Sequence, residues 1–154
     1  YLGKSVLREV DEDEFMKNIA DIRSSCGDRA VLRAMHFYGD NARVEKQAAA
    51  LKAGDFETFK KYIIESGRSS YMYNQNVYSC KKASEQPVSL ALSLSEKLLD
   101  GCGAWRVHGG GFAGTIQAFV PLNKLDEYKD LMEKVFGSGS CYILSVRPVG
   151  GVEL

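Results

Sequence analysis

The chain has 154 residues, of which 45% are hydrophobic, and its 20 lysine and arginine residues balance its 20 aspartate and glutamate residues. This length and hydrophobic content suit one domain with a sizeable core, and the balanced charge argues against nucleic acids or anionic membranes as partners. No apolar run approaches the length of a membrane span and no signal peptide is visible, so we expect a cytoplasmic protein. Because the chain opens with Tyr1 and not Met, we also expect it to be a piece of a longer protein.

The first half of the chain is dominated by helical periodicity. Residues 4–10 are short and mixed and predict a brief strand, after which an acidic run opens a helix that reaches Ile22. A long helix is expected from about residue 28 to residue 52. A third begins after Asp55, a typical capping residue, and is expected to end at Gly67.

The long helix carries two stripes of side chains at helical spacing. The apolar stripe, expected to face the core, consists of Ala30, Ala34, Phe37, Val44, Ala48 and Leu51. The polar stripe beside it consists of Arg33, His36, Asp40, Arg43 and Gln47. Spacing of three and four lets these side chains pair along one face. The stripe is interpreted as an exposed salt-bridged face, as a ridge against a partner domain, or as both.

Residues 69–82 are polar and rich in tyrosine, with Tyr71, Tyr73 and Tyr78 interleaved with asparagine and glutamine. Such a segment suits an ordered connector with half-buried tyrosines, and it also suits contact with a ring or a sugar. A further helix is expected to begin at Pro87 and to stop at Gly101.

Two alternating segments joined by glycines follow. Residues 104–108 and 115–120 each alternate apolar and polar side chains and predict two strands of a hairpin. A helix is expected from about Asn123 to Gly137, and residues 141–147 alternate as a last strand. Helices followed by a strand–strand–helix–strand order predict an α+β fold with a small antiparallel sheet backed by helices, in a single domain over residues 1–154.

The hairpin bend is the candidate site of chemistry. It consists of Gly109, Gly110, Gly111, Phe112, Ala113 and Gly114. A run of glycines packs no side chain, so it indicates unusual backbone angles or close approach of a ligand, and bare N–H groups can cradle a phosphate. The alternative is a plain turn. The absence of a following Lys-Ser/Thr pair argues against a P-loop, and the absence of a following helix argues against a dinucleotide fingerprint.

The four cysteines, at positions 26, 80, 102 and 141, form no C-x-x-C pair. They are interpreted as free thiols of a reducing compartment and not as a disulfide framework. A zinc site from Cys80, Cys102 and His108 is the weaker alternative, because the paired short spacings of zinc ligands are absent. We therefore expect no metal ligands in this chain.

Two stretches together resemble a known family. Arg33-Ala34-Met35-His36 followed by Asp40-Asn41-Ala42-Arg43 resembles the R-A-x-H-x-x-x-E-N-x-R helix of galactokinases. The segment from Gly103 to Gly114, G-A-W-R-V-H-G-G-G-F-A-G, resembles their third motif, G-A-R-M-T-G-G-G-F-G-G. The A-G-D and E-S landmarks between them and an S-L-R-D-V-like start lie in the family's order. The resemblance therefore runs over nearly the whole chain.

The resemblance implies the C-terminal half of a two-domain sugar kinase of the GHMP superfamily, with a ferredoxin-like α+β core. It implies transfer of the γ-phosphoryl group of ATP, with Mg²⁺, to the anomeric hydroxyl of galactose. The catalytic aspartate, the sugar contacts and the main nucleotide loop would belong to the N-terminal half, whose motifs are absent here. That half, ATP and the sugar are the implied partners, and residues 1–154 alone are expected to be inactive.

Only the glycine loop carries over from the family residue by residue. We expect Gly109 to Gly111 to approach the phosphates or to brace the neighbouring phosphate loop, and Phe112 to anchor the loop in the core. His108 and Ala113 replace the family's usual Thr and Gly. The histidine offers a protonatable contact near phosphate or is satisfied by a neighbour, and the alanine methyl makes positive φ costly. The alternatives are a stand-alone ferredoxin-like module that binds a small molecule or has a regulatory role, and a galactokinase-like sugar sensor without turnover.

Overall fold

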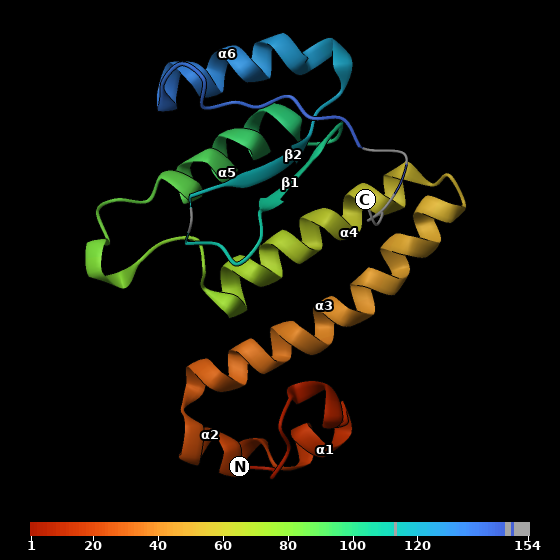
Figure 1. The fold of residues 1–154 in the computed structure, drawn as a ribbon, viewed down its shortest axis with the longest axis vertical. Coiled ribbons are helices and arrows are strands. Elements are labelled where there is room, and N and C mark those ends of the chain that lie inside the picture. The colour runs from red at the N-terminus through yellow and green to blue at the C-terminus, as the bar shows by residue number, and fades with distance from the viewer. Residues whose placement is uncertain (113, 147–148, 150–154) are drawn as a thin grey trace. The chain divides into compact units, whose positions relative to one another are not determined.

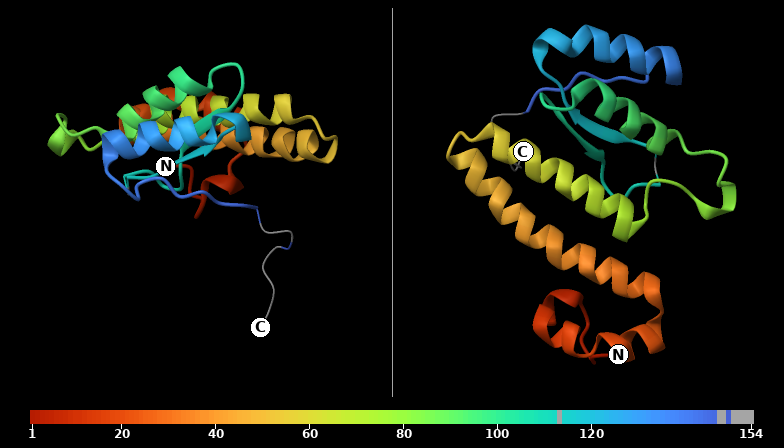
Figure 2. Two further views of the ribbon diagram at one scale, coloured as in Figure 1. Left: turned by 90° about the horizontal axis from the view of Figure 1, so that it is seen from above. Right: turned by 180° about the vertical axis from the view of Figure 1, so that it is seen from behind.

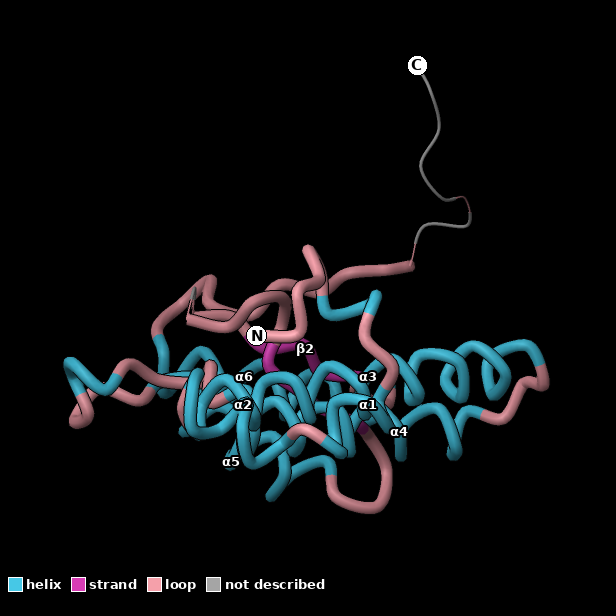
Figure 3. Tube along the Cα trace, turned by 90° about the horizontal axis from the view of Figure 1, so that it is seen from below, coloured by secondary structure: helices cyan, strands magenta, loops and turns pink. Residues whose placement is uncertain are grey.

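The computed structural model describes residues 1–112, 114–146 and 149, and the described chain is mostly helical (Figures 1 and 3). The helices are α1 (Glu12–Lys17), α2 (Ile19–Cys26), α3 (Asp28–Lys52), α4 (Phe56–Ser69), α5 (Pro87–Leu99) and α6 (Leu125–Phe136). The strands are β1 (Ala104–Val107) and β2 (Ile116–Phe119). They pair antiparallel, with Ala104 opposite Phe119 and Val107 opposite Ile116. This small sheet among helices agrees with the α+β class predicted from the sequence.

Contacts between residues divide the chain into two compact units, Tyr1–Val120 and Pro121–Leu154. The first unit contains α1 to α5 and both strands. The second contains a 3₁₀ turn, Leu122–Lys124, followed by α6. The glycine loop and the residues described below as contacting it lie in the first unit.

Within the first unit, α3 and α4 lie side by side and α4 packs on β1 (Figure 2). Gly67 allows α4 to approach β1 closely. A Cβ built on Gly67 would lie 2.9 Å from the Cβ of Arg106 and 3.1 Å from the main-chain oxygen of Trp105. Any larger residue would therefore push the helix off the strand.

Two apolar clusters support these elements. One joins the N-terminal helices to the start of α3 and consists of Val10, Phe15, Ile22, Val31, Ala34 and Tyr38. The other joins α3, α4 and the sheet and consists of Ala50, Phe59, Ile63 and Ala104. The rings of Phe59 and Phe119 meet edge to face with their centroids 5.3 Å apart, which fixes α4 against β2.

Several local predictions are wrong. Residues 4–10 contain a 3₁₀ turn, Leu7–Glu9, in place of a strand. The first predicted helix is broken at Asn18 into α1 and α2. Helix α4 passes through Gly67 to Ser69, because this glycine serves close packing and not helix termination. Residues 141–146 form no strand, although their apolar and polar side chains alternate.

The apolar stripe of the long helix is also displaced. Val31, Ala34, Tyr38 and Ala50 are the buried apolar residues of α3, whereas Val44 and Leu51 are exposed. The predicted stripe shares only Ala34 with this set. The physical reason is that the polar stripe of α3 lies against α4. The apolar residues beside that stripe are therefore turned partly toward the surface.

Candidate functional site

The glycine loop closes the hairpin between β1 and β2. The main-chain N–H of His108 donates to the carbonyl oxygen of Thr115 at 3.1 Å, which extends the strand pairing by one step into the loop. Gly109, Gly110, Phe112 and Gly114 are exposed. Ala113 lies outside the described residues. The loop is thus a surface feature whose backbone is accessible to a ligand or a partner.

The N–H groups of Gly111 and Phe112 are already used in hydrogen bonds. The N–H of Gly111 donates to the oxygen of His108 at 3.4 Å, and that of Phe112 donates to the oxygen of Asn76 at 2.9 Å. Among the residues that the structure describes, nothing accepts from the N–H of Gly109 or Gly110. These two consecutive donors are the groups that an anion would use.

Gly110 is a glycine that the fold itself does not require. Its φ lies outside the left-handed region, and a Cβ built on it would meet no described atom within 4 Å. Gly111 is the opposite case. It has φ +73°, and its Cβ would lie 2.1 Å from the main-chain oxygen of Asn76. A side chain at 110 would therefore meet no described part of the chain, and the bare glycine leaves its backbone open to close approach by an outside molecule.

The loop is supported by Asn76, which follows a single π-helical turn, Ser70–Asn74. Asn76 is 2% exposed. Its Nδ2 donates to the oxygen of Gly110 at 3.3 Å, and its Oδ1 accepts from the Oγ of Ser70 at 2.9 Å. Sequence reasoning placed this asparagine in the tyrosine-rich connector without assigning it a role, because no local pattern links it to a loop 34 residues away.

The tyrosines of the same connector are not gathered at the loop. Tyr71 is exposed, and its hydroxyl donates to Ser89 Oγ on α5 at 3.3 Å. Tyr73 and Tyr78 are half-buried. The connector interpretation predicted such half-burial, and it is confirmed for these two residues.

A second polar cluster lies between α3, α4 and β1, and we call it the polar seam. It consists of His36, Asp40, Arg43, Ser66, Ser69 and Arg106. Ser66 is fully buried, donates to Asp40 Oδ1 at 2.6 Å and accepts from Arg106 Nη1 at 2.8 Å. Arg43 pairs with Asp40 at 3.0 Å. The seam thus joins the middle of α3 to the strand that leads into the glycine loop.

His36 is the titratable member of the seam with a displaced pKa. Its side chain is 14% exposed, and its Nδ1 lies 3.0 Å from Ser69 Oγ. Burial lowers the pKa of His36 below its usual 6.5, and the charges of Arg43 and Arg106 act in the same direction while Asp40 opposes them. The polar stripe of the long helix is therefore largely an interhelical seam and not a solvated face, although Arg33 is exposed.

The side chains of Phe112 and His108 are both exposed at the glycine loop. Phe112 does not anchor the loop in the core, because its side chain is 56% exposed and its backbone has φ +43°. That prediction is wrong, and Gly111 against Asn76 provides the anchor. The side chain of His108 is exposed and makes no hydrogen bond or ion pair with the described residues. Within the same described ranges, no group of three or more His, Cys, Asp or Glu side chains is arranged to hold a metal ion.

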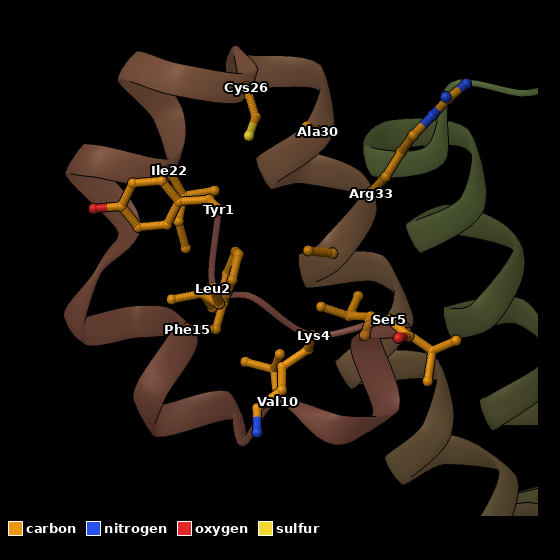
Figure 4. A pocket seen from close by; sticks show the side chains of 13 residues that line it. Tyr1, Leu2, Lys4, Ser5, Val10, Phe15, Ile22, Cys26, Ala30 and Arg33 are labelled. Atoms are coloured by element: carbon orange, nitrogen blue, oxygen red, sulfur yellow. The ribbon is translucent and has the colours of Figure 1, made fainter.

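A hollow of about 360 Å³ lies at the N-terminal end of the first unit (Figure 4). Its walls include Leu2, Val10, Phe15 and Ile22, whereas Arg33 extends away from it. It shares no residue with the loop or with the buried part of the seam. Because the lining of this hollow is mainly apolar, the loop is the better candidate for binding phosphate. No helix in the described part of the chain is long and apolar enough to cross a membrane.

No family model matches the chain. Individual proteins do match it. Human galactokinase is 31% identical over 153 residues, which is 99% of this chain and 36% of that enzyme. Bovine galactokinase is 30% identical over 143 residues, which is 92% of this chain and 33% of that enzyme. The chain is therefore related in sequence to sugar kinases.

Bacterial enzymes extend the same relationship. Galactokinase of Haemophilus influenzae is 26% identical over 132 residues, or 86% of the chain and 32% of the enzyme. The chain thus spans about a third of the length of the curated relatives that it matches. The chain is, more particularly, similar to galactokinases over most of its length, and its span is consistent with a C-terminal piece of such an enzyme.

Proposed function

We propose that this chain is the C-terminal domain of an ATP-dependent galactokinase and that it supplies the glycine loop to the active site. The enzyme would move the γ-phosphoryl group of ATP to the C1 hydroxyl of galactose, in the cytoplasm, where free cysteines such as the four of this chain persist. The observation that carries the proposal is similarity to galactokinases over nearly the whole chain.

The loop geometry supports a role in phosphoryl transfer. That reaction needs positioning and stabilisation of negative charge more than covalent chemistry. The N–H groups of Gly109 and Gly110 are fixed dipoles that have no hydrogen-bond acceptor among the described residues. The open space at Gly110 lets a phosphate approach the backbone closely. His108 is a candidate accessory contact at the end of β1. Magnesium would assist by neutralising phosphate charge, and we place its ligands elsewhere in the longer protein, because no group of three or more His, Cys, Asp or Glu side chains among the described residues is arranged to hold a metal ion.

The remaining parts of the site are assigned to the N-terminal half of the same protein. We place the catalytic aspartate, the sugar contacts and the main nucleotide loop there. We also propose that β1 and β2 belong to the ferredoxin-like fold of GHMP kinases, which a crystal structure of the longer protein would test.

A kinase assay tests the proposed function. The longer protein should phosphorylate galactose with ATP and Mg²⁺ in preference to other hexoses, and residues 1–154 alone should show no transfer because the catalytic residues are elsewhere. Phosphate transfer by residues 1–154 alone would contradict this division of labour. Binding of galactose and ATP without turnover by the longer protein would instead indicate a sugar sensor.

A further inference from the structure

We propose that Asn76 is a positioning residue that fixes the glycine loop for its phosphate ligand, with Ser70 holding the Asn76 side chain. This inference rests on the proposed function, because it assigns the loop the same ligand. Asn76 lies outside the hairpin, at the start of the segment after the π-turn. Its role would be to set the backbone of Gly109 and Gly110 without touching substrate.

The first support is the distribution of hydrogen bonds. Among the described loop residues, 109–112 and 114, every hydrogen bond to described chain outside the hairpin goes to Asn76. Its side-chain amide reaches the oxygen of Gly110 at 3.3 Å, and its main-chain oxygen reaches the N–H of Phe112 at 2.9 Å. One residue therefore fixes the loop on both sides of Gly111.

The second support is packing. A Cβ on Gly111 would lie 2.8 Å from the Cβ of Asn76 and 2.1 Å from its oxygen. The two backbones thus approach more closely than any side chain at position 111 would allow. Because Asn76 and Ser70 are each 2% exposed, water does not compete for their hydrogen bonds.

The third support is local backbone strain. Among the described residues, Gln75 with φ +53° and Phe112 with φ +43° are the two non-glycine residues in the left-handed region. Gln75 directly precedes Asn76, and Phe112 donates to it. Such conformations cost free energy and persist where the surroundings impose them, often at functional sites. The strained residues Gln75 and Phe112 therefore lie on the two sides of the contact between Asn76 and the loop, to which we assign the positioning role.

The test uses the longer protein and the variant Asn76→Asp. The carboxylate is isosteric with the amide but cannot donate to the oxygen of Gly110, so the loop backbone should shift. We expect the KM for ATP to rise about tenfold, the change that corresponds to roughly one lost buried hydrogen bond. The KM for galactose should change by less than about twofold. Ser70→Ala should move the KM for ATP in the same direction by a smaller factor, and it keeps the proposal testable if Asn76→Asp fails to fold.

Ser95→Ala is the matched control. Ser95 is fully buried in α5, and its hydroxyl donates to the oxygen of Ala91 at 2.8 Å. Its loss should lower the unfolding temperature without changing the KM for ATP.

If the Asn76 and Ser70 variants lose only stability, as the control does, the positioning role is wrong and the proposed function stands. If the unmodified protein binds ATP without turnover, calorimetric affinity for ATP with Mg²⁺ replaces KM. If it binds no ATP, both proposals fail.

Discussion

His36 is the residue through which pH reaches the polar seam. Its pKa is lowered first by burial and further by Arg43 and Arg106, while Asp40 raises it and Ser69 holds one ring nitrogen. The unfolded chain therefore binds a proton at His36 at a higher pH than the folded chain does. The stability linked to this residue is complete above about pH 6.5 and is lost as the pH falls through 6.5 toward the folded pKa.

The corresponding prediction compares the protein with its His36→Gln variant. Glutamine keeps a polar group near Ser69 but does not titrate. The unfolding temperature of the unmodified protein should fall more between pH 7.5 and pH 5 than that of the variant, as measured by thermal unfolding at several pH values. Identical pH profiles for the two proteins would show that His36 is not protonated on unfolding.

At the scale of elements, the contact between α4 and β1 depends on Gly67. The Cβ of an alanine would meet the backbone and Cβ of Arg106 at about 3 Å, where neither strand nor helix can move easily. We expect Gly67→Ala to reduce the free energy of unfolding by about 1–3 kcal/mol, as overpacking does. Denaturant unfolding of the two proteins measures the difference.

Gly39→Ala is the matched control within α3. The nearest atoms to its Cβ belong to the flexible guanidinium of Arg43, at 3.3 Å. Relief of glycine's low helix propensity should leave stability unchanged or raise it by up to about 1 kcal/mol. If both glycine variants lose the same stability, helix interior strain and not the α4–β1 contact would be the cause.

The helices and strands differ in how far they could be predicted from the sequence. Helical spacing predicted the helices from residue 28 to residue 99, and period-two alternation predicted the β1–β2 hairpin. Spacing could not decide which of two adjacent stripes on α3 is buried, because that depends on α4. Gly67 carried the signal of a helix end, but its reason is tertiary. Residues 141–146 alternate as strands do, yet alternation supplies no pairing partner.

The candidate site was only partly predictable for the same reason. The glycine run itself indicated a loop with bare amides. Asn76 gave no signal, since its contact with the loop depends on the π-turn and on the left-handed conformation of Gln75. Phe112 was expected inside because it is a large apolar residue, and the strained backbone of the loop places it outside.

At the scale of the whole molecule, the chain combines similarity to galactokinases with an accessible glycine loop. The chain matches about a third of each galactokinase, and the glycine loop is accessible in the first compact unit. A loop that offers the N–H groups of Gly109 and Gly110, which have no acceptor among the described residues, is incomplete as an active site. The proposed enzyme therefore needs the rest of the protein to supply the base, the sugar contacts and the metal.

The most direct measurement is kcat/KM for ATP and the unfolding temperature of Gly110→Val in the longer protein. The structure offers open space at this position, so the unfolding temperature should change little. The added side chain should block the approach of phosphate to the backbone, and kcat/KM should fall by about 100-fold, the scale of losing one oxyanion donor. An unchanged kcat/KM would show that the loop lies outside the active site.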